Sequence, residues 1–246
     1  MIKELNHIGL LTASIEVSKD FYTGVLGGTI IRDHKDAEGS LFTYIQLALG
    51  VIELIRVAAD NPNAGFAHVA YLIDDEKTLD EYYQYLVEKG YEFTLAPKPT
   101  TAGDGRLAFF NDKSGTSFEL IERKENIRIR DLVNERIEAF KYTAIYAPPA
   151  AIPECDTFYT QEMGFSLTEP NQYAIGADVI KLIPTEDETL LKKPLSHICF
   201  KVKNCKETLD YLMEQDIKCS EISICEEAGQ YFIIEGPSGE QVVFVQ

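Results

Sequence analysis

Two histidines and two glutamates in the first half of the chain lie inside short apolar runs. His7 lies in the run LNHIGL and His68 in FAHVAY, while Glu53 lies in VIELI and Glu119 in FELI. Neighbouring residues of a strand face opposite sides of a sheet. Val51 and Ile55 therefore share the face of Glu53 while Ile52 and Leu54 lie on the other, and both faces are apolar. An unpaired carboxylate there would cost several kcal/mol or take up a proton. A divalent cation shared with the two imidazoles would stabilise both carboxylates, so these four residues are candidate metal ligands.

Two nitrogen and two oxygen ligands leave two positions open in an octahedral coordination sphere. Such a set suits one divalent ion of Ni, Co, Zn, Mn or Fe and differs from a closed structural zinc site. A single histidine on an apolar strand is more often a packed core residue than a ligand. Here, however, four residues of ligand type occupy the same positions, in the first and last strands, of two neighbouring repeats, and this favours a metal site. Glu119 and Glu53 are then also candidate catalytic bases.

The sequence repeats itself at long range. The motif FYT followed by LG at 21–27 recurs as FYT followed by MG at 158–164, TLD at 78–80 recurs at 208–210, and SG at 114–115 recurs at 238–239. The three pairs keep the same order in both halves, which indicates an internal duplication. Tyr22 and Tyr159, within the repeated motif, are expected to pack helix against sheet.

Each half contains two copies of a smaller pattern, a strand followed by an amphipathic helix and three more strands. In the first half this pattern predicts strands at 6–12, 29–33, 42–47 and 51–57 with a helix at 14–26, then strands at 67–73, 91–95, 106–110 and 117–122 with a helix at 78–89. The predicted fold is therefore α+β, with four βαβββ modules. The predicted domains are 1–123 and 140–246. The charged segment 124–139 between them lacks Gly and Pro and is expected to be a helical connector.

Composition narrows the expected partners. The chain has 246 residues, with 40 Asp and Glu against 23 Lys and Arg and a formal net charge of −17. This charge repels nucleic acid and anionic membranes, so a small-molecule substrate is the expected partner. No run approaches the roughly 20 apolar residues of a membrane span and no leader pattern opens the sequence, so a cytoplasmic location is expected. The five cysteines form no CxxC pair and are expected to be reduced packing residues.

The sequence resembles the vicinal-oxygen-chelate superfamily, which includes glyoxalase I, methylmalonyl-CoA epimerase, fosfomycin- and bleomycin-resistance proteins and extradiol dioxygenases. The matching phrases are NHIG at 6–9, FY to LG at 21–27, IEL at 52–54, AHVA at 67–70, and FFND to FELI at 109–121. The resemblance implies two domains, each a cup-shaped mixed sheet with flanking helices and ligands on the first and last strands of each module. The order His, Glu, His, Glu is that of glyoxalase I, whereas the dioxygenases and fosfomycin-type proteins use His, His, Glu.

The second half resembles the same fold but departs from the ligand pattern. Its four equivalent positions are Tyr142, Lys181, His197 and Val243. Since three of them are not metal ligands, His197 is expected to be structural and 140–246 to be a degenerate second domain. This domain would take the place of the second subunit of one-domain relatives, so the chain is expected to be a monomer or a homodimer.

The resemblance implies a metal-dependent lyase or isomerase of glyoxalase I or epimerase type. It would act on a small carbonyl or hydroxycarbonyl substrate through a metal-stabilised enediolate. Bacterial glyoxalase I usually contacts glutathione through an arginine a few residues after the first histidine and an asparagine after the first glutamate. The corresponding positions here read GLL at 9–11 and IRV at 55–57, so the identity of the substrate is left open. One alternative is an iron(II) extradiol-type dioxygenase that uses His7, His68 and Glu119. Another is a non-catalytic small-molecule binding protein.

Overall fold

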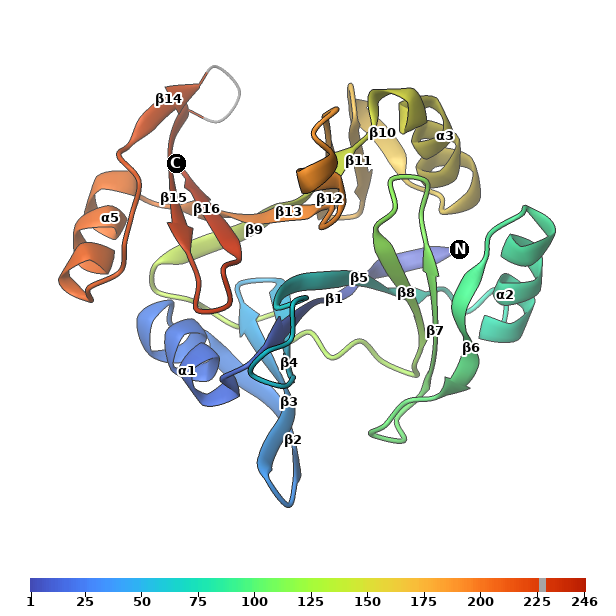
Figure 1. Ribbon diagram of the computed structural model, residues 1–246, viewed down its shortest axis with the longest axis horizontal. Helices are drawn as coiled ribbons and strands as arrows, with labels where there is room; N and C mark the ends of the chain where they lie inside the picture. The colour runs from blue at the N-terminus through green and yellow to red at the C-terminus, as the bar shows by residue number, and fades with distance from the viewer. Residues whose placement is uncertain (226–228) are drawn as a thin grey trace. The chain divides into compact units, whose positions relative to one another are not determined.

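The computed structural model describes residues 1–225 and 229–246 and contains two eight-stranded mixed sheets (Figure 1). The first sheet has the order β2-β3-β4-β1-β5-β8-β7-β6 and the second has the order β10-β11-β12-β9-β13-β16-β15-β14. The strands of the first sheet are β1 (Ile2–Thr12), β2 (Thr29–Asp36), β3 (Gly39–Leu47), β4 (Gly50–Arg56), β5 (Gly65–Ile73), β6 (Phe93–Pro99), β7 (Arg106–Asn111) and β8 (Ser117–Glu122). Those of the second are β9 (Ile137–Ala147), β10 (Ser166–Glu169), β11 (Gln172–Ile175), β12 (Asp178–Pro184), β13 (Leu195–Val202), β14 (Ser223–Cys225), β15 (Gly229–Glu235) and β16 (Gln241–Val245).

The strand order confirms the four βαβββ modules and the α+β fold. In each module, the first strand pairs with the last strand, and the two middle strands continue outward to the sheet edge. The pairs β1–β4, β5–β8 and β13–β16 are parallel, whereas the hairpin pairs are antiparallel. A parallel pair needs a long crossover, and the helix and two middle strands of each module supply it.

The helices fall where the repeats predict them. They are α1 (Ile15–Asp20), α2 (Leu79–Glu88), α3 (Ile152–Thr157) and α5 (Cys205–Glu214), with a short α4 (Glu188–Leu191) and a 3-10 turn η2 (Pro149–Ala151) in addition. The repeated FYT motif opens the π-helical turns that follow α1 and α3, namely η1 (Phe21–Val25) and η3 (Phe158–Glu162). Each turn is followed by a glycine in the left-handed region, Gly27 at φ 71° and Gly164 at φ 83°, as the LG and MG motifs predict. No helix among the described residues has the length and apolar composition needed to cross a membrane.

The predicted helix at 124–139 was wrong. Residues 124–136 contain no helix, and β9 begins at Ile137. The segment is held by hydrogen bonds to distant residues instead. Ile129 exchanges a pair of hydrogen bonds with the Gln46 side chain, and Asn134 Nδ2 donates to the carbonyl oxygens of Leu26 and Gly27. The Gln46 side chain thus satisfies the backbone N–H and C=O of Ile129, and the Asn134 side chain ties the connector to the end of η1. These hydrogen bonds fix the connector without a helix.

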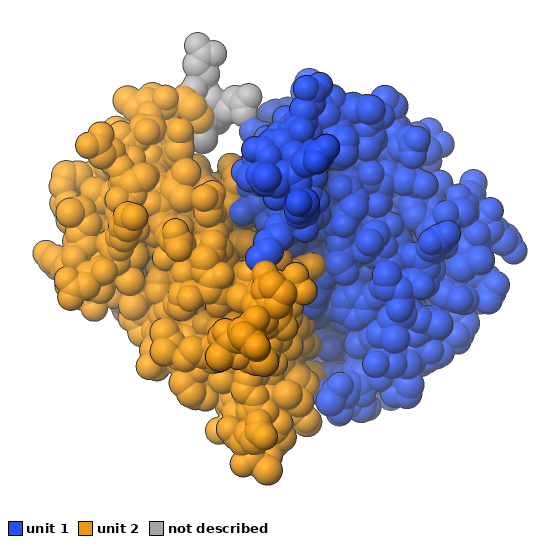
Figure 2. All heavy atoms as spheres, in the orientation of Figure 1, with its two compact units in different colours: residues 1–7, 68–127, 144–196 blue, residues 8–67, 128–143, 197–246 orange. Residues whose placement is uncertain are grey.

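The contacts of the chain define two compact units that do not follow the halves of the sequence (Figure 2). Unit 1 consists of residues 1–7, 68–127 and 144–196, and unit 2 consists of residues 8–67, 128–143 and 197–246. Unit 1 therefore contains most of the second and third modules, and unit 2 most of the first and fourth. The first predicted domain, 1–123, contains all strands of the first sheet, whereas the predicted start of the second, at 140, falls inside β9, and the two-domain division stays a prediction.

A buried tyrosine–carboxylate pair joins the two modules of unit 2. The hydroxyl of Tyr22, in η1, donates a 2.8 Å hydrogen bond to Oε1 of Glu240, in the turn before β16. Both residues are buried, and Glu240 Oε2 also accepts from the backbone N–H of Ser238 at 2.8 Å. Burial raises the pKa of the Glu240 carboxyl, although the hydrogen bond from Tyr22 opposes this shift.

Unit 1 contains the same arrangement. Tyr159 in η3 donates a 2.6 Å hydrogen bond to Oδ2 of Asp112, in the turn between β7 and β8. Oδ1 of Asp112 accepts from the backbone N–H groups of Ser114 and Thr116, at 2.9 Å each. The predicted packing role of the two tyrosines is thus accompanied by a polar one, because each hydroxyl satisfies a buried carboxylate of another module.

We expect Tyr22→Phe and Tyr159→Phe each to lower the free energy of unfolding by about 1–3 kcal/mol, because each leaves a buried carboxylate without one of its donors. Urea unfolding followed by circular dichroism measures the loss. The control is Tyr83→Phe, which removes the hydroxyl of a half-buried tyrosine on α2 whose ring packs on Phe93. Equal stability of all three variants would show that the two buried pairs contribute nothing to folding.

Candidate metal centre

The register of the parallel pairs places each glutamate beside the histidine of its own module. In the β5–β8 pair, Ala70 lies opposite Glu119, and in the β1–β4 pair, Gly9 lies opposite Glu53. Ala70 and Gly9 each come two residues after a histidine, His68 and His7 respectively. Because side chains alternate along a strand, a residue two positions on shares the same face. The first and the second module therefore each present one imidazole and one carboxylate on one face of the sheet.

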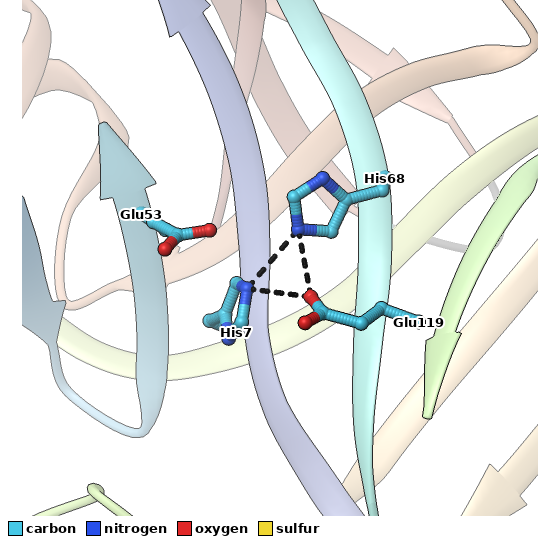
Figure 3. Close-up of side chains that lie close together, drawn as sticks. All are labelled: His7, Glu53, His68 and Glu119. Carbon is cyan, nitrogen blue, oxygen red and sulfur yellow. Dashed lines mark hydrogen bonds and ion pairs between the residues drawn. The ribbon is translucent and has the colours of Figure 1, made fainter. Parts of the chain in front are cut away.

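Three of the predicted ligands form a tight triangle of donor atoms. His7 Nε2 lies 3.1 Å from His68 Nε2 and 3.2 Å from Glu119 Oε2, and His68 Nε2 lies 3.1 Å from that same oxygen (Figure 3). The three residues are only 1%, 5% and 3% exposed, respectively. Glu53 is 9% exposed, and one ligand atom from each of the four residues lies within 4.8 Å of the others. The structure thus brings together all four side chains that the sequence singled out.

The triangle has the dimensions of a metal coordination face. Donor atoms about 2.1 Å from one cation and 90° apart lie about 3 Å from each other, close to the three observed separations. Two imidazole nitrogens and a carboxylate oxygen that converge in this way, with little water nearby, repel one another unless a proton or a cation lies among them. A divalent ion meets this requirement for all three atoms, so the donor set fits a metal.

The electrostatics of Glu119 favour the ionised form that a metal needs. Burial by itself raises the pKa of this carboxyl. Hydrogen bonding to His68 is the largest effect that opposes burial, and the pKa of Glu119 is held below its ordinary value. The ring of His68 is further packed edge-on against Phe109 of β7, with the centroids 5.2 Å apart, which limits its rotation.

Sequence reasoning assigned no role to two residues next to this cluster. Asn6 is buried, and its Oδ1 lies 2.9 Å from His7 Nδ1. Arg123, directly after β8, places Nη1 3.2 Å from that same oxygen. Only the position of Asn6 immediately before His7 offered a signal in the sequence, because Arg123 is 117 residues away from Asn6.

In the second half, most of the positions equivalent to the four predicted ligands carry side chains that do not bind metal. In the β13–β16 pair, Cys199 lies opposite Val243, so Val243 has the same offset from His197 that Glu119 has from His68. Tyr142 and His197 contact each other edge-on, with their ring centroids 5.7 Å apart. Val243 packs with Cys199 and Val245 in a buried apolar cluster. Hydrocarbon therefore occupies the slot that corresponds to Glu119.

The first half of the chain matches a family model and several curated proteins, among them lactoylglutathione lyases and metallothiol transferases. The family model "Glyoxalase/Bleomycin resistance protein/Dioxygenase superfamily" matches residues 4–120. A "Probable lactoylglutathione lyase" of Vibrio cholerae is 30% identical over 129 residues, which cover 48% of this chain and 90% of that protein. The "Lactoylglutathione lyase GLX1" of Arabidopsis thaliana is 29% identical over 126 residues, which cover 48% of this chain but only 43% of that protein.

Solved structures match over the whole chain, with lower sequence identity. The Mn(II)-bound glyoxalase from Novosphingobium aromaticivorans has a TM-score of 0.72 at 15% identity, covering 99% of this chain and 81% of that one. Homoprotocatechuate 2,3-dioxygenase from Brevibacterium fuscum has a TM-score of 0.71 at 15% identity, covering 100% of this chain and 80% of that one. These matches show a shared fold. Together with the family model and the Vibrio relative, they establish that the chain belongs to the glyoxalase/bleomycin resistance protein/dioxygenase superfamily.

Proposed function

We propose that this protein is a metal-dependent lyase or isomerase that acts on a small carbonyl or hydroxycarbonyl substrate, with His7, Glu53, His68 and Glu119 as the ligands. The observation that carries the proposal is the convergence of three buried donor atoms at 3.1–3.2 Å with a second carboxylate within 4.8 Å. The glyoxalase and lactoylglutathione lyase names of several relatives support this reaction class.

The two carboxylates are the candidate proton carriers. When bound, a divalent cation supplies Lewis-acid stabilisation for negative charge on a substrate oxygen. In this proposal Glu119 or Glu53 accepts the proton from the carbon beside the substrate carbonyl and returns it at the neighbouring atom. Hydrogen bonding to His68 keeps Glu119 in the ionised form, which is the form that can accept a proton. The low exposure of all four side chains limits water and strengthens these charge interactions.

A second candidate function is an iron(II) extradiol-type dioxygenase. The observation in its favour is that His7, His68 and Glu119 alone form a complete two-histidine, one-carboxylate face, with mutual distances of 3.1–3.2 Å. In this case Glu53 is not needed as a ligand. A non-catalytic binding protein is a third candidate, because this fold need not carry catalysis.

The metal itself is the first test. We expect the purified, untagged protein to contain or bind about one equivalent of a transition metal per chain, measured by elemental analysis. The His7→Ala, His68→Ala double variant should lower metal affinity by more than about 100-fold, since loss of ligands costs at least as much as loss of their outer-shell partners.

The matched control for this test is His197→Ala, which removes the imidazole from the equivalent slot of the second half. It should leave metal content unchanged. Absence of metal from the wild-type protein after reconstitution would overturn the proposal, and would leave the four residues as a structural cluster.

Single substitutions separate the two enzymes. For a lyase or isomerase, Glu53→Gln and Glu119→Gln should each lower turnover by roughly 10²–10⁴-fold, because each removes a candidate base. The measurement is incorporation of solvent deuterium beside the carbonyl of α-hydroxycarbonyl test substrates, followed by NMR. If Glu53→Gln keeps full activity while His7→Ala abolishes it, and the iron-loaded protein consumes O₂ with catechols, the dioxygenase is the correct assignment.

A further inference from the structure

We infer that a buried hydrogen-bond relay, from Arg123 through Asn6 to His7, fixes the tautomer of His7 and leaves its Nε2 free of a proton. The inference rests on the proposed metal site and adds two positioning residues to it. Every member of the relay lies in unit 1. The relay acts on the imidazole before any metal binds, so it can be measured independently of activity.

The orientation of the Asn6 amide follows from its neighbours. Arg123 Nη1 lies 3.2 Å from Asn6 Oδ1, and a guanidinium can only donate hydrogen bonds, so the amide oxygen must face it. On the other side, Asn6 Nδ2 donates to Asn126 Oδ1 at 3.1 Å, and Asn126 Nδ2 donates to the carbonyl oxygen of Leu5 at 3.1 Å. A carbonyl oxygen can only accept, so Asn126 must present its own oxygen to Asn6. Both ends of the relay therefore require the same orientation of Asn6.

The proton on His7 follows from the orientation of Asn6. Oδ1 of Asn6 lies 2.9 Å from His7 Nδ1, and an amide oxygen cannot donate. Nδ1 of His7 must therefore carry the hydrogen. In a neutral imidazole the other nitrogen is then an acceptor, and Nε2 of His7 is the atom that faces His68 Nε2 and Glu119 Oε2. The relay thus directs a lone pair of His7 into the donor triangle.

The charge of Arg123 strengthens the relay. Its side chain is only 4% exposed, and its Nε lies 3.5 Å from Oδ2 of Asp104, in the turn between β6 and β7. Asp104 is itself held by Thr100, whose hydroxyl donates to Asp104 Oδ1 at 2.7 Å and accepts from the Asp104 backbone N–H at 3.1 Å. A hydrogen bond from a buried guanidinium polarises the Asn6 amide and makes its oxygen a better acceptor for His7.

The other histidine slots lack this neighbour. The residue before His68 is Ala67 and the residue before His197 is Ser196, and neither side chain carries an amide. At the slot equivalent to Asn6 in the second half stands Lys141, which is exposed. The amide therefore occurs beside His7, in the half that retains the ligand set.

The test is the protonation pattern of His7 in metal-free protein labelled with ¹⁵N-histidine. The chain has four histidines, so His7→Ala assigns the His7 signals by difference. In long-range ¹H–¹⁵N spectra at about pH 8, where ordinary imidazoles are neutral, we expect Nδ1 of His7 to be the protonated nitrogen. A wild-type spectrum with the hydrogen on Nε2 would overturn the inference.

Variants test the two positioning residues. Asn6→Leu removes the acceptor at similar size, and should give mixed His7 tautomers and a 10- to 100-fold loss in affinity for Co²⁺, roughly the effect of losing an outer-shell partner. Asn6→Asp keeps an oxygen acceptor and should preserve the Nδ1–H signal. Arg123→Met should shift the tautomer ratio in the same direction as Asn6→Leu, and it supplies the test if Asn6→Leu does not fold. Unchanged tautomers in both Asn6→Leu and Arg123→Met would contradict the relay.

The outcomes separate this inference from the proposed function. Wild-type protein with Nδ1–H on His7 but without affinity for Co²⁺ or another divalent metal would leave the relay intact and remove the metal site. Wild-type protein that binds metal but carries the hydrogen on Nε2 in the metal-free state would keep the metal site and remove the relay.

Discussion

The parallel pairing of β1 with β4 and of β5 with β8 is the constraint on which the site depends. In the β5–β8 pair this register sets Glu119 opposite Ala70, two residues after His68. A shift of one residue would turn the carboxylate to the other face of the sheet and away from the imidazole. The helix and the two middle strands of the module provide the crossover that a parallel pair requires. The helix and middle strands of each of these modules are therefore the connection that allows its first and last strands to pair in this register.

Buried carboxylates have two different solutions in this protein. Asp112 and Glu240 are satisfied by a tyrosine hydroxyl and by backbone N–H groups of their own turns. Glu119 instead faces two imidazoles, which offer a proton or a lone pair but not the fixed donors of a turn. The first solution occurs in both units and accompanies the repeated FYT motif, so it belongs to the fold. The second occurs at the cluster that we propose as the metal site.

The sequence predicted the module order and the four clustered side chains because both follow from local patterns. Alternating apolar residues gave the strands, the glycine after each FYT motif gave the helix ends, and comparison of equivalent slots gave the cluster. The connector at 124–136 was missed because its hydrogen-bond partners, such as Gln46 and Leu26, are far away in the sequence. Arg123 was missed for the same reason, since no local pattern links it to Asn6.

The contrast between the halves argues that a cation compensates the carboxylates of the first half. A buried carboxylate without a cation or a full set of donors costs several kcal/mol, so a module that no longer binds metal is more stable with a hydrocarbon side chain there. Val243, packed with Cys199 and Val245, puts hydrocarbon at that position of the second half, and His197 contacts the ring of Tyr142. Glu53 and Glu119 stand in equally enclosed positions, 9% and 3% exposed, and both remain carboxylates. Under the proposed function, a divalent metal held by Glu119 and the two imidazoles aimed at it would offset the cost of these buried carboxylates.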